Sequence, residues 1–425
     1  MARRLYFFQA SMLPLISLLA PASLAIDLNT SSSSSVASVS QTIASSLFAT
    51  YYNPASTAGD FTQPQPWFWW LSGSAWTTIM DYTVFTTDTT YKANLLTALA
   101  ENIGENNDFI PAAQASWEAN DDQAYWLYSA LTALEYDFDP ITPCTGAGTG
   151  ANGTCTNSWL SIASNAFNVY VDRWNADSAT CGGGLKWQYN PSASGYTYKN
   201  SVTNGGFFQT AARLARYTGN TTYAEWVGKI WDWSTAVGYV SSNFNVYDGA
   251  GDEDTANCTE INEDQWSYNV ATYLHGAAHM YAYTGGDAAW EARVQGLVGA
   301  ANATFFSPPS GNATGVMYEQ NCELTSACTI DQTSFKSSLA RWMAKSAMLV
   351  PSVKDDVMAV LATSAKSAAA SCTDGTSGNV TCGMKWWTAD GFDGYSDFGS
   401  MLSALEVVQS LLVTNAPELA KLASS

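Results

Sequence analysis

The chain has 425 residues, of which 47% are hydrophobic and only 13% charged, and its formal net charge is −20. This balance argues against nucleic acid or an anionic membrane surface as a partner, because both require a basic face. The 17 Trp and 22 Tyr residues are instead a large supply of flat rings, which proteins use in cores and for stacking on sugars.

The N-terminal 25 residues are predicted to be a secretory signal peptide. Arg3 and Arg4 precede the apolar run "LYFFQASMLPLISLLA", and small residues lead to a cleavage site after Ala25. No later stretch is apolar enough for an integral membrane segment, and the C-terminus has no hydrophobic tail of the lipid-anchor type. We therefore expect a secreted, extracellular protein with one domain over 26–425, in which 26–40 is a flexible leader.

Two alternating sets of helices are predicted from the apolar periodicity. The phrases "YTGNTTYAEWV" and "YTGGDAAWEARV" begin at Tyr217 and Tyr283, 66 residues apart, and each indicates a helix end, a tight turn and a new helix. One set has an apolar stripe, near 36–51, 89–101, 158–173, 222–236, 287–303 and 352–371. The other set is small, apolar and aromatic on many faces, near 70–86, 121–136, 206–218, 268–284, 334–350 and 397–413.

Six helix hairpins of this kind predict an all-α fold, an (α/α)6 barrel. An open solenoid is the alternative, but neither end of the chain has the polar capping repeats that a solenoid needs. In a barrel, all helices of the second set run in the same direction. The segments that precede them, which are rich in acids, amides and aromatics, should therefore meet at one rim.

The eight cysteines are typical of an oxidising compartment. Pairing of close neighbours predicts Cys322–Cys328, Cys372–Cys382 and Cys144–Cys155, which leaves Cys181 with Cys258. Glycosylation sequons are typical of a secreted glycoprotein and occur at Asn29, Asn152, Asn220, Asn302, Asn312 and Asn379.

The stretch "WEANDDQAYW", residues 117–126, places two aspartates together at a predicted helix start. Cleavage of a glycosidic bond requires two carboxyl groups, about 5–5.5 Å apart in retaining enzymes, and adjacent residues can reach that separation. With Asn120 as the N-cap, Asp121 and Asp122 fall in the first turn. Simple helix capping is the competing interpretation of the pair.

Other motifs point to no metal and no cofactor. His275 and His279 are four residues apart but lack the glutamate and third ligand of a zinc protease, so we interpret them as a core pair. The acidic segment 248–258 misses the calcium-loop spacing. Gly182–Gly184 lacks the Lys-Ser/Thr of a phosphate loop.

Several segments together resemble glycoside hydrolase family 76, the endo-α-1,6-mannanases, and within it the fungal cell-wall proteins. They include "NDDQAYW", "CGGGLKWQ", "GYTYKNSVTNGGFF" and "DQTSFKSSLARWM". The resemblance implies an (α/α)6 barrel and retaining chemistry on α-1,6-linked mannose, with Asp121 as nucleophile and Asp122 as acid/base. Fungal relatives are linked to transfer of lipid-anchor glycans to wall glucan, so a transglycosylase is also implied.

The rim residues are then expected to bind substrate. The aromatic candidates for sugar stacking and the polar candidates for hydroxyl binding are Trp69, Trp70, Trp187, Trp266, Tyr268, Asn120, Asn204, Asn269, Asp331 and Lys336. We expect a monomer whose partner is a glycan such as α-1,6-mannan. The two rival hypotheses are a wall-glycan binder without activity and an adhesion module, and the second predicts that the rim residues do not converge.

Overall fold

The computed structural model describes residues 25–56, 58–61, 68–141, 158–253, 257–309, 313–374, 378–388 and 391–422. The expected signal sequence up to residue 24 and the Cys144–Cys155 pair lie outside these ranges. The described residues form twelve α-helices. These are α1 (Ser33–Tyr51), α2 (Trp69–Thr86), α3 (Lys92–Asn102), α4 (Asn120–Glu135), α5 (Trp159–Ala176), α6 (Ser201–Thr218), α7 (Thr221–Ala236), α8 (Ser267–Tyr283), α9 (Ala288–Phe305), α10 (Ile330–Leu349), α11 (Lys354–Ala370) and α12 (Phe398–Gln409).

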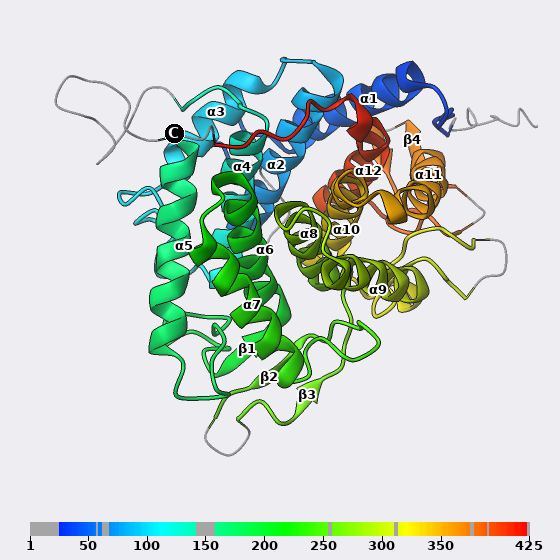
Figure 1. Cartoon of the computed structure of the whole chain (residues 1–425). Coiled ribbons are helices and arrows are strands. Elements are labelled where there is room, and N and C mark those ends of the chain that lie inside the picture. Colours follow the sequence, from blue (N-terminus) through cyan, green and yellow to red (C-terminus); the bar gives the residue numbers. More distant parts are fainter. Residues whose placement is uncertain are drawn as a thin grey trace, which may run out of the picture.

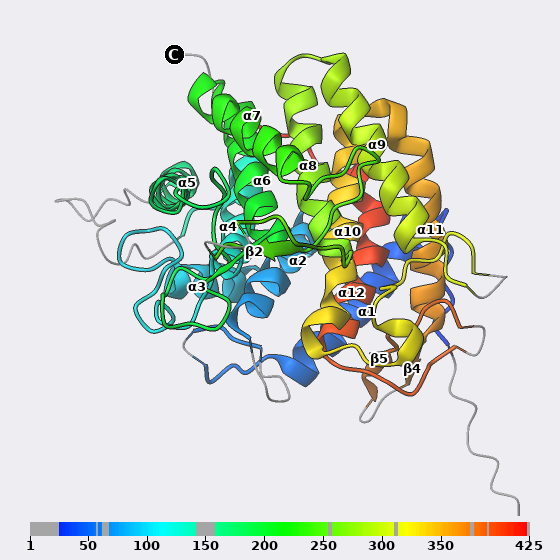
Figure 2. The ribbon, with the colours of Figure 1, turned by 90° about the horizontal axis from the view of Figure 1, so that it is seen from below.

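The even-numbered helices form a closed inner ring. Neighbours along the chain contact one another in the order α2, α4, α6, α8, α10 and α12, and α12 returns to contact α2. The odd-numbered helices pack outside this ring (Figure 1), and the view from below shows α8 to α12 gathered beside one another (Figure 2). The predicted (α/α)6 barrel of six helix hairpins is confirmed.

Small residues allow the inner helices to approach closely. In α6 every residue from Ser201 to Arg216 is buried, so the helix has no solvent face. At the contact between α6 and α8, a Cβ on Gly276 would lie 2.4 Å from the Phe208 ring. Only glycine fits there, so the close approach of α6 and α8 depends on Gly276.

The serine run begins a helix instead of a flexible leader. The Ser32 side chain accepts a hydrogen bond from the N–H of Ser35, and α1 follows from Ser33. Serine is a preferred N-cap because its hydroxyl satisfies a free N–H of the first turn. Val36, Ile43 and Leu47 are buried, and α1 packs on α12. The leader expected over 26–40 therefore does not extend past Ser32.

Short strands and disulfides tie the loops together. One antiparallel sheet joins β1 (Tyr198–Asn200), β2 (Gly249–Gly251) and β3 (Ile261–Asn262), and β4 (Cys372–Asp374) pairs with β5 (Val380–Cys382). The predicted disulfides Cys181–Cys258, Cys322–Cys328 and Cys372–Cys382 are all formed. None of the described helices is long and apolar enough to cross a membrane.

The C-terminal segment crosses the end of the barrel where the inner helices finish, and appears as the red trace in Figure 1. The N–H of Ala420 donates to the carbonyl of Glu135, at the end of α4, and Arg216 at the end of α6 donates to the carbonyls of Leu419 and Ala420. The opposite end, where the inner helices begin, carries the predicted rim.

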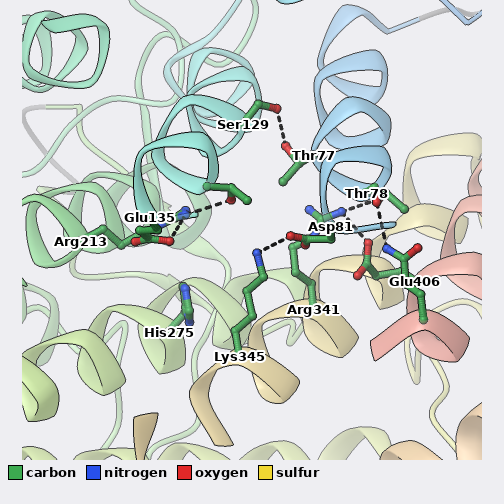
Figure 3. A network of polar contacts seen from close by, with 12 residues as sticks. Thr77, Thr78, Asp81, Ser129, Glu135, Arg213, His275, Arg341, Lys345 and Glu406 are labelled. Carbon is green, nitrogen blue, oxygen red and sulfur yellow. Dashed lines mark hydrogen bonds and ion pairs between the residues drawn. The ribbon is translucent and has the colours of Figure 1, made fainter. Parts of the chain in front are cut away.

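Ion pairs fill the middle of the ring (Figure 3). Arg341 of α10 bonds to Glu406 of α12 at 2.8 Å and to Thr78 of α2, and its Nε lies 3.4 Å from Asp81. Lys345 also pairs with Asp81, at 2.6 Å. A single arginine thus links three inner helices, including the first and the last.

Replacing Arg341 with methionine is expected to lower the free energy of unfolding by about 3–5 kcal/mol, because Glu406 would be left as a buried charge without its partner. Chemical denaturation followed by circular dichroism measures the loss. Lys92→Met is the control, since Lys92 is half-buried and its partner Asp139 is exposed, so the expected loss is below about 1 kcal/mol. Equal losses in the two variants would contradict a special role for the central pairs.

Candidate active site

The two neighbouring aspartates open α4 at the rim. The N–H of Ala119 donates to Oδ2 of Asp122 at 2.7 Å, and the N–H of Asp122 donates to Oδ1 of Asp121 at 3.2 Å. The N-cap is therefore Ala119, and the sequence-based prediction of Asn120 as the N-cap is wrong. Each aspartate has one oxygen bonded to the first turn, and both side chains are half-buried, so that solvent still reaches them.

Asn120 supports the loop that carries Trp187. Its side-chain amide donates to the carbonyl of Lys186 at 2.9 Å, and its oxygen accepts from Arg173 at 2.6 Å. Its backbone N–H donates to the carbonyl of Trp187 at 3.0 Å. Every polar group of Asn120 that we expected to bind sugar is thus engaged within the protein.

The same loop is fixed from its other side. Lys186 pairs with Asp252 at 2.7 Å, and the Cys181–Cys258 disulfide joins the two loops on which these residues lie. Gly195, with φ of +87°, packs so closely on the Trp187 ring that a Cβ would lie 2.4 Å from it. The Trp187 indole is therefore held rigidly, and it donates to the Asp121 carboxyl.

The rim encloses a cleft with two lobes that share one wall. The lobe of about 390 Å³ that contains Asp121, here called the Asp121 lobe, is lined by Phe68, Trp70, Trp117, Asp121, Asp122, Tyr125, Trp187, Gln188, Tyr268, Asp331 and Phe335. The lobe of about 350 Å³ that contains Glu118, here called the Glu118 lobe, is lined by Phe68, Trp69, Trp70, Gln114, Trp117, Glu118 and Asp122. Asp122 lines both lobes, whereas Asp121 lines only one.

Burial raises the pKa of both catalytic candidates. For Asp121, desolvation is the largest cause of the rise and the Asp122 charge is the second. Together they raise the pKa of Asp121 well above its usual value. Burial raises the pKa of Asp122 to about 7, against the opposing bond from Ala119, and the Asp331 charge adds to the rise. The pair therefore holds at least one proton near neutral pH, as a site with one acid and one carboxylate requires.

Two further acids border Asp122. Burial raises the pKa of Asp331 to about 6, although a hydrogen bond from Trp70 opposes the rise. Burial raises the pKa of Glu118 to about 9, and the Tyr189 hydroxyl, which donates to Oε1 at 2.9 Å, opposes it. A proton is easily retained in such a group of carboxyls, since each charge disfavours the next.

Four predicted substrate residues line the Asp121 lobe, namely Trp70, Trp187, Tyr268 and Asp331. Tyr268 stacks on Phe335 with ring centres 4.0 Å apart, and Trp70 leans on Tyr125 at 4.5 Å. The rim residues thus converge, contrary to the hypothesis of an adhesion module. Trp69 borders only the Glu118 lobe, and its indole donates to Asn102 inside the wall.

The other polar candidates are bound within the protein. Lys336 is 1% exposed, pairs with Glu323 at 2.7 Å and donates to the carbonyl of Met384. Asn204 is fully buried and joins the backbone of Leu185 to α6. We therefore correct these two assignments, because their side chains hold loops and do not face the cleft.

Asn269 and Trp266 lie near the rim but outside both lobes. Asn269 is buried beside Asp248, with Nδ2 to Oδ1 at 3.5 Å. Trp266, at the N-cap of α8, packs edge-to-face with the Phe335 ring, and the two ring centres are 5.6 Å apart.

Sequence reasoning missed several lining residues. Tyr125 and Phe335 lie four residues after Asp121 and Asp331, one helical turn along the same face, so helical periodicity offered a signal. Trp117 is 80% exposed and Glu118 only 3% exposed, in a turn where sequence gives no signal for the direction of a side chain.

The family model for glycosyl hydrolase family 76 matches residues 35–423. The mannan endo-1,6-alpha-mannosidase DCW1 of Saccharomyces cerevisiae is 39% identical over 85% of this chain and 75% of its own length. A putative mannan endo-1,6-alpha-mannosidase of Schizosaccharomyces pombe is 37% identical over 92% of this chain and 83% of its own.

Solved structures have the same fold. Dfg5 from Chaetomium thermophilum, crystallised with glucosamine, is 34% identical, with a TM-score of 0.81 over 92% of this chain and 94% of its own. An inactive variant of the alpha-1,6-mannanase GH76A of Salegentibacter, in complex with alpha-1,6-mannotriose, has a TM-score of 0.66 at 17% identity, over 89% of this chain and 99% of its own. The match over nearly the whole described barrel, with its paired acids at the rim, shows that the chain belongs to glycosyl hydrolase family 76.

Proposed function

We propose that this protein is a secreted retaining glycoside hydrolase that cleaves α-1,6-linked mannan. One observation carries the proposal, namely that two adjacent carboxyls face one aromatic cleft at the rim of a family 76 barrel. The names of the yeast relatives described above identify them as mannan endo-1,6-alpha-mannosidases. The Salegentibacter enzyme is inactive when two neighbouring aspartates are replaced by asparagine.

The contacts of the pair support separate roles. Asp121 accepts hydrogen bonds from the Asp122 N–H and the Trp187 indole, which stabilise a carboxylate. It therefore attacks the anomeric carbon of the sugar as nucleophile. Burial raises the pKa of Asp122 to about 7, and the Asp331 charge adds to the rise, so Asp122 can hold a proton near neutral pH. It therefore donates a proton to the leaving glycosidic oxygen.

The second step reverses the proton transfer. Asp122, now a carboxylate, removes a proton from water, and the water oxygen attacks the anomeric carbon. The ester bond to Asp121 breaks and Asp121 leaves as a carboxylate, so the sugar regains its original configuration. If a sugar hydroxyl replaces the water, the same steps transfer the glycan to cell-wall or lipid-anchor glycans.

An extracellular location at the cell wall agrees with the three disulfides of the described residues, since such bonds persist in oxidising compartments. A non-catalytic glycan binder, the remaining rival, would have no need of adjacent acids in a buried site. Its prediction is tight binding of α-1,6-mannooligosaccharides without turnover.

Asp121→Asn is expected to abolish turnover of α-1,6-mannotetraose, because an amide cannot form the ester intermediate. Asp122→Asn should lower turnover about 10²–10⁴-fold, yet spare the first release of fluoride from α-mannosyl fluoride, because that leaving group needs no proton. Mass spectrometry measures the products, and NMR of the first product should show the α-anomer. Unchanged turnover in Asp121→Asn, or a β-anomer, contradicts the assignment.

Thermal unfolding checks that these variants fold. Folding takes up a proton at Asp121 at pH values between its unfolded pKa and its raised folded pKa, so this group lowers wild-type stability as the pH rises through that range. The amide carries no such cost. Asp121→Asn should therefore have an equal Tm at pH 4 and an equal or higher Tm at pH 7.

The rate on the oligosaccharide should fall above about pH 7, because Asp122 acts as the acid only while it holds its proton. Asp331→Asn removes a charge that raises the pKa of Asp122, so the alkaline limb should move to lower pH. Profiles of kcat/KM measure the shift, with Asp139→Asn, an exposed acid, as the control. A limb that stays in place or moves to higher pH contradicts the contact between Asp331 and Asp122.

A further inference from the structure

The two lobes give the cleft a direction. Asp122 lines both lobes, and in the proposed function its proton goes to the oxygen that joins two sugars. Asp121 lines only its own lobe, so the sugar that it attacks must lie there. The sugar on the other side of the bond then falls in the Glu118 lobe.

Glu118 presents an unused polar group to that lobe. It is 3% exposed, and while Oε1 accepts from the Tyr189 hydroxyl, Oε2 is buried and has no hydrogen-bond partner. A buried polar atom without a partner is unfavourable, and a bound hydroxyl would relieve this. Since burial raises the pKa of Glu118 to about 9, the group is neutral near pH 7 and suits an uncharged ligand.

Trp117 supplies an apolar face at the lobe boundary. It is 80% exposed, the highest value among the large hydrophobic residues that the structure describes. An indole held open beside a cleft provides a flat surface on which a sugar ring can stack. Gln114 lines only the Glu118 lobe, and its side-chain amide is a candidate to bond a further hydroxyl.

We propose that the Glu118 lobe binds the neutral sugar on the leaving-group side of the scissile bond, and afterwards the acceptor sugar, with Glu118 bonding a hydroxyl and Trp117 stacking on the ring. The proposal rests on the proposed function. In transfer, the acceptor hydroxyl gives its proton to Asp122, and its oxygen bonds to the anomeric carbon. The ester bond to Asp121 breaks, and Asp121 leaves as a carboxylate.

The test compares the kcat/KM values of the full-length protein on two substrates. α-1,6-Mannotetraose places a sugar in the Glu118 lobe, whereas α-mannosyl fluoride fills the Asp121 lobe alone. Glu118→Leu should lower kcat/KM for the tetraose about tenfold and change that for the fluoride less than twofold. Trp117 borders both lobes, so Trp117→Ala should lower kcat/KM for both substrates, and more strongly for the tetraose. Trp117→Phe and Glu118→Gln, which keep a ring and a neutral polar group, should restore most of the loss.

Leu324→Ala is the matched control, because Leu324 is exposed but lies outside both lobes. Equal losses on the two substrates, or no loss on the tetraose, overturn the inference. A wild-type enzyme that turns over neither substrate, or a fully active Asp121→Asn variant, overturns the proposed function instead. With mannobiose added to the fluoride reaction, any transfer product should fall in Trp117→Ala relative to hydrolysis.

Discussion

Closure of the inner ring by buried charges determines where the cleft lies. Arg341 bonds to α2 and α12, the first and last inner helices, and Lys345 adds a second link to α2 through Asp81. The net stabilisation from such pairs is small, because both charges are desolvated. A shift of one helix along another would leave a charge without its partner, so alternative registers are strongly disfavoured. The six helix starts are thereby held at fixed positions around one opening.

At that opening two electrostatic effects oppose each other, and desolvation is the larger. A helix N-terminus favours a carboxylate by about 0.3–1 kcal/mol, which is less than one pKa unit. Yet burial raises the pKa of Asp122 from 3.8 to about 7. Aromatic rings such as Trp70 and Trp187 line the cleft beside Asp122, whose burial causes this rise. The ring of helices positions the acids, and the aromatic lining sets their protonation.

The sequence was sufficient to predict the barrel, the position of the aspartate pair at the rim and the described disulfides, because helical periodicity and cysteine spacing are local signals. It was insufficient for side-chain direction. Asp331 and Lys336 both follow the start of α10, but five residues turn the helix by about 500°, so Lys336 points into the wall while Asp331 faces the cleft. Asn120 was placed correctly at the rim, but its side chain bonds to the Trp187 loop.

The same helical step explains how neighbouring residues can have different roles. Consecutive side chains on a helix diverge by about 100°, so Asp121 and Asp122 leave α4 in different directions. Asp121 points into one lobe, and Asp122 stands on the wall between two. A bound chain of sugars then has only one orientation in which the attacked carbon meets the first acid and the bridging oxygen meets the second. Adjacency on the helix therefore gives the pair its polarity along the cleft.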